Sequence, residues 1–246
     1  MGYTYVMSDL HGLYKEYLQM LEQIQFSEQD KLYVLGDVID RGPDGIRLLQ
    51  DFMQRDNVVL LLGNHEDMML AVVTLEEFSG EEYERRMFHW SQNGGDVTAH
   101  DFFCNLNYKE QARLITYLES CPLFLPDVRV NGKQFYLVHA HPYTGKAWTD
   151  KTITTESLAD IPEEAETLKK QVLWERIDGT ECFDEGSTVV FGHTPTIHYQ
   201  EQLPMAFWHG SGCINIDCGC AYLARGRNEG RLGCLRLEDG AEFYQV

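Results

Sequence analysis

Three short apolar stretches near the N-terminus each end in polar residues and lead into a segment with helical spacing. We predict buried strands over residues 3–8, 31–35 and 57–62, each followed by a helix. Alternation of this kind predicts parallel strands joined by helices, in a sheet whose ligands bind beyond the carboxyl ends of the strands. The pattern therefore favours an α/β fold with a site at one sheet edge.

The rest of the chain adds helices and a second set of strands. Residues 76–121 are expected to be mostly helical, with a break at Asn93-Gly94-Gly95, and residues 155–170 to form a surface loop and a helix. Further strands are expected at 127–130, 133–138, 188–191, 205–208, 213–216, 232–237 and 241–244. Since no repeat or linker interrupts the sequence, we expect a single domain over residues 1–246.

The composition is that of a globular, strongly acidic protein. Hydrophobic residues make up 43% and charged residues 24% of the 246 residues, which is enough for a large buried core. The formal net charge of −19 argues against nucleic acid and anionic membranes as partners, because both need a basic face. It does not exclude phosphate substrates, since bound metal cations reverse the local charge.

Two features favour a cytoplasmic protein. The first residues carry no basic segment followed by an apolar run, and nowhere do about 18 apolar residues follow one another. The seven cysteines are scattered and odd in number, which is typical of reduced thiols rather than of a disulfide framework. We therefore expect a soluble chain in the cytoplasm. The sequence leaves its oligomeric state open, and a monomer is compatible with it.

Residue types that bind metals gather at the predicted strand ends. They are Asp9 and His11, Asp37 and Asp40, Asn64 and His65, and the later His139 and His193, and the cation Arg41 directly follows Asp40. Carboxylate, imidazole and amide oxygen together suit manganese, iron or zinc better than calcium, which prefers oxygen alone. The set is too large for one catalytic tetrahedral ion, but it fits two ions that share a carboxylate, with Asp37 at the centre. Such pairs activate water and neutralise a phosphoryl group during in-line displacement.

Five motifs carry a resemblance to a known family. They are Asp9-Leu10-His11-Gly12, Gly36-Asp37-Val38-Ile39-Asp40-Arg41-Gly42, Gly63-Asn64-His65-Glu66, His139 and Gly192-His193-Thr194-Pro195. Because these motifs occur in this order, the chain resembles the calcineurin-like metallophosphoesterases. Within that family it resembles most the phosphoprotein phosphatases of the small bacterial and phage-lambda type. The resemblance spans nearly the whole chain. It implies an α/β fold, α+β in some schemes, in which a four-layer β-sandwich is flanked by helices.

The resemblance also implies a role for each candidate residue. Two divalent ions would be held by six ligands, with Asp37 shared, Asp9 and His11 on one ion, and Asn64, His139 and His193 on the other. His65, oriented by Asp40, would protonate the leaving-group oxygen, while Arg41 and Arg176 would clamp the phosphate. The attacking group would be a metal-bound hydroxide, with no phosphoenzyme. Manganese is the expected metal, with iron or zinc as alternatives.

Simpler interpretations remain for several residues. Arg176 lies in a stretch of weak pattern and could form a surface salt bridge instead. His141 could face the site, but a place behind the metal ligands or in solvent is favoured. Glu66 is expected to stabilise the start of its helix through the helix dipole. Asp217 suits a carboxylate behind the metal ligands or a structural one. The remaining histidines are expected to be structural or exposed: His89, His100, His198 and His209.

The sequence is compatible with three functions to different degrees. The favoured one is a phosphatase of phosphoserine or phosphothreonine in proteins, because Asp40 is typical of that branch of the family and Glu66 fits it better. The alternative is a symmetrical bis(5′-nucleosyl)-tetraphosphatase, a related branch in which a small residue often replaces the acid. A binding protein without catalysis is disfavoured, because every ligand position is filled and both His65 and Arg41 are present. The expected partner is thus a phosphorylated protein or a small phosphate ester.

Overall fold

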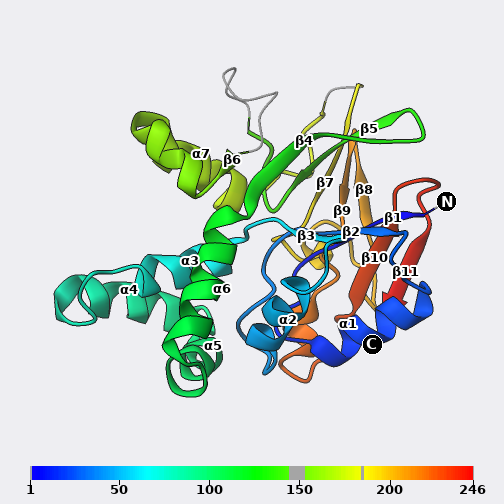
Figure 1. Ribbon diagram of the computed structural model, residues 1–246. Helices are drawn as coiled ribbons and strands as arrows, with labels where there is room; N and C mark the ends of the chain where they lie inside the picture. The colour runs from blue at the N-terminus through cyan, green and yellow to red at the C-terminus, as the bar shows by residue number, and fades with distance from the viewer. Residues whose placement is uncertain (1, 144–152, 184–185, 246) are drawn as a thin grey trace.

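The computed structural model describes residues 2–143, 153–183 and 186–245, which form two β-sheets and the helices around them (Figure 1). The first sheet has the strand order β11-β10-β1-β2-β3. Its strands are β1 (Thr4–Met7), β2 (Lys31–Val34), β3 (Val58–Leu60), β10 (Leu232–Arg236) and β11 (Glu242–Gln245). β1, β2 and β3 are parallel, as the alternation with helices predicts, whereas β10 and β11 add antiparallel strands at one side.

The second sheet has the order β6-β4-β5-β7-β9-β8. Its strands are β4 (Pro122–Val130), β5 (Lys133–Val138), β6 (Ile153–Thr154), β7 (Thr188–Phe191), β8 (Trp208–Gly210) and β9 (Cys213–Asn215). β5, β7 and β9 are parallel, and β4 and β5 form the hairpin expected around Asn131-Gly132. Each sheet therefore has a parallel centre, and the polar residues after β5 and β7 leave the second sheet in the same direction.

Helices fill the connections between the strands. α1 (Tyr14–Gln23), α2 (Gly45–Phe52) and α3 (Asn64–Val73) follow the first three strands, and α7 (Pro162–Trp174) contacts β4. The long helical connection is made of α4 (Gly80–Gln92), α5 (Asp96–His100), a short π-helix and α6 (Tyr108–Ser120). It lies on the side of the molecule away from β10 and β11 (Figure 1). A single turn of helix, α8 (Cys220–Leu223), precedes β10.

The two sheets face each other, and the side chains between them form a hydrophobic cluster separate from the one that contains the helices. In β1, Val6 joins the cluster that contains Phe135 and Leu137 of β5, whereas Tyr5 and Met7 join the cluster that contains the helices. This division follows from the two-residue period of a strand, which sends alternate side chains to opposite faces. The expected α/β fold, a β-sandwich flanked by helices, is confirmed.

Several boundaries differ from those expected. Strand β4 begins at Pro122, five residues before the expected start, and its pairing with β5 shifts between Leu125 and Val128. Residues 205–207 lie outside β8, and neither β6 nor α8 was expected. Pairing with a neighbouring strand decides such short elements, and that information is not local in the sequence. None of the helices in the described ranges combines the length and apolarity needed to span a bilayer.

Candidate metal centre

Most of the candidate residues sit on loops with unusual backbone conformations, whereas Asn64 and His65 begin α3. Eight non-glycine residues of the described chain have a positive φ, and six of them are candidate site residues: Asp9, His11, Asp37, Asp40, Arg41 and His193. Such conformations cost about 1–3 kcal/mol each and persist only where the surroundings enforce them. Strain is therefore concentrated where the strands of both sheets end.

Glycines allow the strand-end loops to approach each other at backbone distance. A Cβ atom on Gly36, where φ is +78°, would lie 2.4 Å from the Cα and N atoms of Gly63. A Cβ on Gly63 would lie 2.4 Å from the backbone N of Asp37. Larger residues at these positions would push the two loops apart, which explains why a glycine precedes both Asp37 and Asn64.

Glu66 ties the same two loops together with its side chain. The carboxylate is fully buried and accepts the backbone N–H groups of Gly63 at 2.9 Å, Asp37 at 2.9 Å, Val38 at 2.8 Å and Ile39 at 3.2 Å. Burial and the nearby Asp37 carboxylate raise the pKa of Glu66 to about 7. Glu66 caps the start of α3 as expected, and in addition it fixes the loop that carries Asp37.

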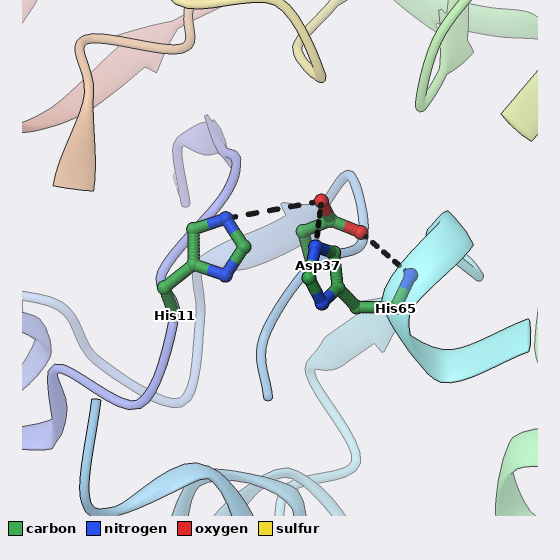
Figure 2. Close-up of side chains that lie close together, drawn as sticks. All are labelled: His11, Asp37 and His65. Carbon is green, nitrogen blue, oxygen red and sulfur yellow. Dashed lines mark hydrogen bonds and ion pairs between the residues drawn. The ribbon is translucent and has the colours of Figure 1, made fainter. Parts of the chain in front are cut away.

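Asp37 lies at the centre of the site. Its Oδ2 atom is 3.8 Å from the Nε2 atoms of both His11 and His65, and its Oδ1 atom is 3.4 Å from Nε2 of His139. Figure 2 shows the two imidazoles converging on the Asp37 carboxylate, whose other oxygen accepts the backbone N–H of His65. Two clusters able to hold an ion share this aspartate, one with His11 and His65 and one with His139 and His193.

Two of these histidines turn a lone pair toward Asp37. His11 Nδ1 lies 3.1 Å from the carbonyl oxygen of Ile39, and His139 Nδ1 lies 2.6 Å from that of Leu35. Each Nδ1–H therefore donates to the backbone, which leaves Nε2 as an acceptor. Burial lowers the pKa of both imidazoles, which favours their neutral forms. Buried acceptors that face a carboxylate fit a bound cation, so this donor set suits a metal ion.

Asn64 and His193 complete the second cluster. Asn64 Oδ1 is 2.9 Å from His139 Nε2 and 3.1 Å from His193 Nδ1. Burial, together with the neighbouring His139, lowers the pKa of His193 to about 3. The opposite orientation of the Asn64 amide would instead donate hydrogen bonds to these nitrogens and to Asp37. With the oxygen inward, the four residues surround one point with acceptors, which is the arrangement that a divalent cation requires.

Asp9 differs from its expected place beside His11. Its Oδ2 atom accepts the backbone N–H of His193 at 3.0 Å and the hydroxyl of Ser8. Among the described residues it joins neither cluster, and His65 takes its place beside His11 and Asp37. Burial, and then the charges of Asp217 and Asp37, raise the pKa of Asp9 well above its usual value. Its role as a ligand stays a prediction.

His65 belongs to a buried hydrogen-bonded chain. Its Nδ1 atom lies 2.6 Å from Asp40 Oδ2, which also accepts the indole N–H of Trp90 at 2.8 Å. Thr98 Oγ1 accepts the backbone N–H of Asp40 at 3.0 Å. Burial opposes protonation of His65, but Asp37 and Asp40 outweigh it and raise its pKa. The sequence predicted the pairing of His65 and Asp40. It gave Trp90 and Thr98 no role, although Trp90 precedes the Asn93-Gly94-Gly95 break.

The two arginines are held differently. Arg41 Nη1 lies 2.7 Å from His11 Nε2 and its Nη2 lies 3.0 Å from His65 Nε2, so its guanidinium spans both imidazoles. Arg176 is exposed just beyond α7, and its charge contributes to the low pKa of His193. The next residue, Ile177, accepts the hydroxyl of Tyr199 at 2.9 Å, which brings this segment to the side of the site that carries His193. Arg176 itself makes no hydrogen bond or ion pair within the described ranges, and both its role as a phosphate clamp and the alternative of a surface salt bridge stay predictions.

Comparison with known proteins gives a family match and several relatives. The model described as calcineurin-like phosphoesterase matches residues 3–215. The symmetrical bis(5′-nucleosyl)-tetraphosphatase of Erwinia tasmaniensis is 44% identical over 71 residues, 28% of this chain and 26% of the relative. The protein of the same name from Coxiella burnetii is 28% identical over 138 residues, 56% of this chain and 41% of the relative. These matches span well under two thirds of the relatives' own length.

Solved structures share the fold over almost the entire chain. A protein provisionally described as a diadenosine tetraphosphatase has a TM-score of 0.57 at 16% identity, covering 99% of this chain and 92% of that one. A serine/threonine phosphatase from Saccharomyces cerevisiae has a TM-score of 0.56 at 12% identity, covering 97% and 73%. At such identities the likeness concerns the fold alone.

Proposed function

The chain belongs to the calcineurin-like phosphoesterase family, and from this premise we propose that it hydrolyses phosphate esters at a centre of two divalent metal ions. The resemblance drawn from the five motifs is confirmed. The observation that carries the proposal is the pair of buried histidine clusters that share Asp37. The neutral imidazoles of His11 and His139, with their lone pairs toward one carboxylate, suit cation binding better than a structural role.

The proposed ligands keep the division expected from the sequence. Asp37 is shared, His11 and Asp9 hold one ion, and Asn64, His139 and His193 hold the other. When bound, the ions supply Lewis acidity, an activated water and neutralisation of the phosphoryl charge. Manganese is the metal we propose, since carboxylate, amide and imidazole donors suit it. We also propose a cytoplasmic location for the protein.

Side chains of the protein would bind the phosphate and protonate the leaving group. Arg41 and Arg176 would bind the phosphate oxygens, for which a planar guanidinium is well shaped. His65 would transfer a proton from its imidazole to the oxygen of the leaving group as the P–O bond breaks. Asp40 would hold the ring in the orientation that this transfer needs, and Trp90 would hold Asp40.

We propose a symmetrical dinucleoside tetraphosphate as the preferred substrate. The curated relatives carry that activity in their names, which supports it better than the phosphoprotein substrate favoured by the sequence. The earlier preference for a protein phosphatase is therefore not confirmed. A phosphoserine or phosphothreonine phosphatase stays the second candidate, because Asp40 is present and is hydrogen-bonded to His65.

A rate comparison tests both levels of the proposal. Hydrolysis of p-nitrophenyl phosphate should require Mn²⁺, stop with a chelator and be lost in Asp37→Asn. His65→Asn should instead act most on alkyl phosphates, whose leaving group needs a proton. Hydrolysis with no divalent metal present would contradict the metal centre. Diadenosine tetraphosphate should then be cleaved with a higher kcat/KM than a phosphothreonine peptide, and the reverse ranking would favour the second candidate.

A further inference from the structure

The segment that follows α7 carries Arg176 but gives its side chain no support. Arg176 is exposed, and in the described part of the chain it makes no hydrogen bond or ion pair. Its neighbour Ile177 is buried and accepts the hydroxyl of Tyr199, which follows His193 by six residues, so the segment lies beside that strand end. Because a free arginine side chain samples many rotamers, its place beside the site must be set by the backbone that bears it.

That backbone is closed into a turn by its own polar groups. The N–H of Asp178 donates to Glu181 Oε1 at 2.6 Å, and the N–H of Glu181 donates to the carbonyl of Asp178 at 3.0 Å. The N–H of Thr180 donates to Asp178 Oδ1 at 2.8 Å. One oxygen of the Glu181 carboxylate is thus used within the turn, which leaves the other oxygen for a partner outside it.

Two contacts join this turn to the strand ends of the site. Glu181 Oε2 lies 2.9 Å from Nε2 of His141, which is 7% exposed and follows His139 by two residues. Tyr199, which follows His193 by six residues, donates its hydroxyl to the carbonyl of Ile177 at 2.9 Å. The segment of Arg176 is therefore anchored to the two chain segments that supply candidate metal ligands from the second sheet.

His141 is itself fixed by its surroundings. Its Nδ1 atom lies 2.8 Å from the carbonyl oxygen of Pro142 and 3.3 Å from Nε2 of Gln171 on α7. Its ring lies 6.0 Å from that of Phe183, at the far end of the same segment. The contact between His141 and Glu181 is also largely sheltered, since the side chains are 9% and 35% exposed. Because His141 is held in place, its contact with Glu181 can fix the position of the turn.

We propose that Glu181 is a positioning residue for phosphate binding. Held by His141, its carboxylate fixes the turn and so presents the Arg176 guanidinium to the phosphate of the substrate. The inference rests on the proposed function, because it requires a phosphate in the site. Glu181 is an anion and would repel that phosphate at contact distance, so its effect must pass through Arg176.

Steady-state kinetics on the Mn²⁺-loaded protein test the inference. Glu181→Ala should raise KM by about tenfold with little change in kcat, as expected when a binding group is misplaced. Glu181→Gln keeps an oxygen for the N–H of Asp178 and offers an amide N–H to Nε2 of His141, whose Nδ1 faces the carbonyl of Pro142, so it should recover part of the loss. Glu175→Ala removes an exposed carboxylate from the same segment and should change nothing.

A double-mutant cycle separates positioning from general stability. If Glu181 acts through Arg176, then Glu181→Ala should have no further effect on KM in an Arg176→Ala background. Additive effects of the two substitutions would overturn the proposal. So would an unchanged KM in Glu181→Ala when Arg176→Ala raises it.

Binding of inorganic phosphate, measured by calorimetry beside thermal melting, gives a readout that does not need turnover. Glu181→Ala should weaken phosphate binding about tenfold, as Arg176→Ala does, and the milder Glu181→Gln serves if the alanine variant is unfolded. A wild-type protein that binds phosphate but hydrolyses no ester would sink the proposed function alone. Absence of phosphate binding to the wild-type protein would overturn the positioning role.

Discussion

The site has two halves that are built in different ways. In the half around β1 and β2, backbone hydrogen bonds join the loops directly. The N–H of His11 donates to the carbonyl of Asp37 at 2.9 Å, and the N–H of Gly12 donates to the carbonyl of Val38 at 2.8 Å. In the half that comes from the second sheet, the N–H of Gly192 likewise donates to the carbonyl of His139 at 2.9 Å, but side chains make the longer connections. His139 reaches the carbonyl of Leu35, and Glu181 reaches His141.

This difference separates two kinds of dependence on sequence. In the first half, strained residues and closely packed glycines let the local backbone set the positions of the site residues. A substitution there should therefore change both the fold and the chemistry. In the second half, Arg176 is exposed and depends on distant partners, so a substitution should change binding while the fold persists. The predictions below set one half against the other.

The largest effect is expected at the residue that both clusters share. Asp37→Asn should lower kcat/KM with Mn²⁺ by at least about a thousandfold, equal to about 4 kcal/mol, because both ions lose a charged ligand. Arg176→Lys should cost only about tenfold, since it keeps the charge and loses the planar fork. Similar losses in the two variants would remove the distinction between the halves.

The buried chain behind His65 should matter for leaving groups that need a proton. Asp40→Asn should lower kcat on an alkyl phosphate by roughly a hundredfold, whereas p-nitrophenyl phosphate, with its stable phenolate, should be affected much less. Trp90→Phe, which removes only the indole N–H, should show the same pattern at roughly tenfold. Equal losses on both substrates would argue against His65 as the acid.

Glu66 tests how far the first half depends on its buried capping carboxylate. Glu66→Gln should lower the free energy of unfolding by about 2–3 kcal/mol, because an amide cannot accept as many of the N–H groups that point at it. Glu110 has the matching position at the start of α6, where it is exposed and accepts the N–H of Asn107. Glu110→Gln should cost less than about 1 kcal/mol in the same urea titration. Equal costs would show that burial of Glu66 is unimportant.

Two glycines with the same backbone conformation isolate the close approach of the loops. Gly36 has a φ of +78° with Gly63 against it, whereas Gly132 has a φ of +80° with nothing near. Gly132→Ala should cost about 1–2 kcal/mol for its left-handed conformation alone. Gly36→Ala should cost at least about 2 kcal/mol more, because the added carbon must displace a backbone. A shared melting temperature for the two variants would mean that the loops move apart freely.

The sequence predicts the first half of the site better than the second. The strand ends after β1, β2 and β3 could be recognised because each places its polar residues and glycines within a few positions of one another. Trp90, Thr98 and the partner of His141 could not be assigned, since each acts across a long stretch of chain that only the fold brings together. The orientation of Asp9 depends on a contact with His193 from the other sheet, which no local pattern specifies.

The central claim is that Asp37 is the ligand shared by a pair of ions that hydrolysis requires. The most direct measurement is a titration of chelator-treated protein with Mn²⁺, in which bound metal and hydrolysis of p-nitrophenyl phosphate are followed together. We predict two ions per chain, with hydrolysis appearing as the sites fill, and loss of both in Asp37→Asn. Full hydrolysis by metal-free protein, or saturation of hydrolysis at one ion per chain, would contradict the claim.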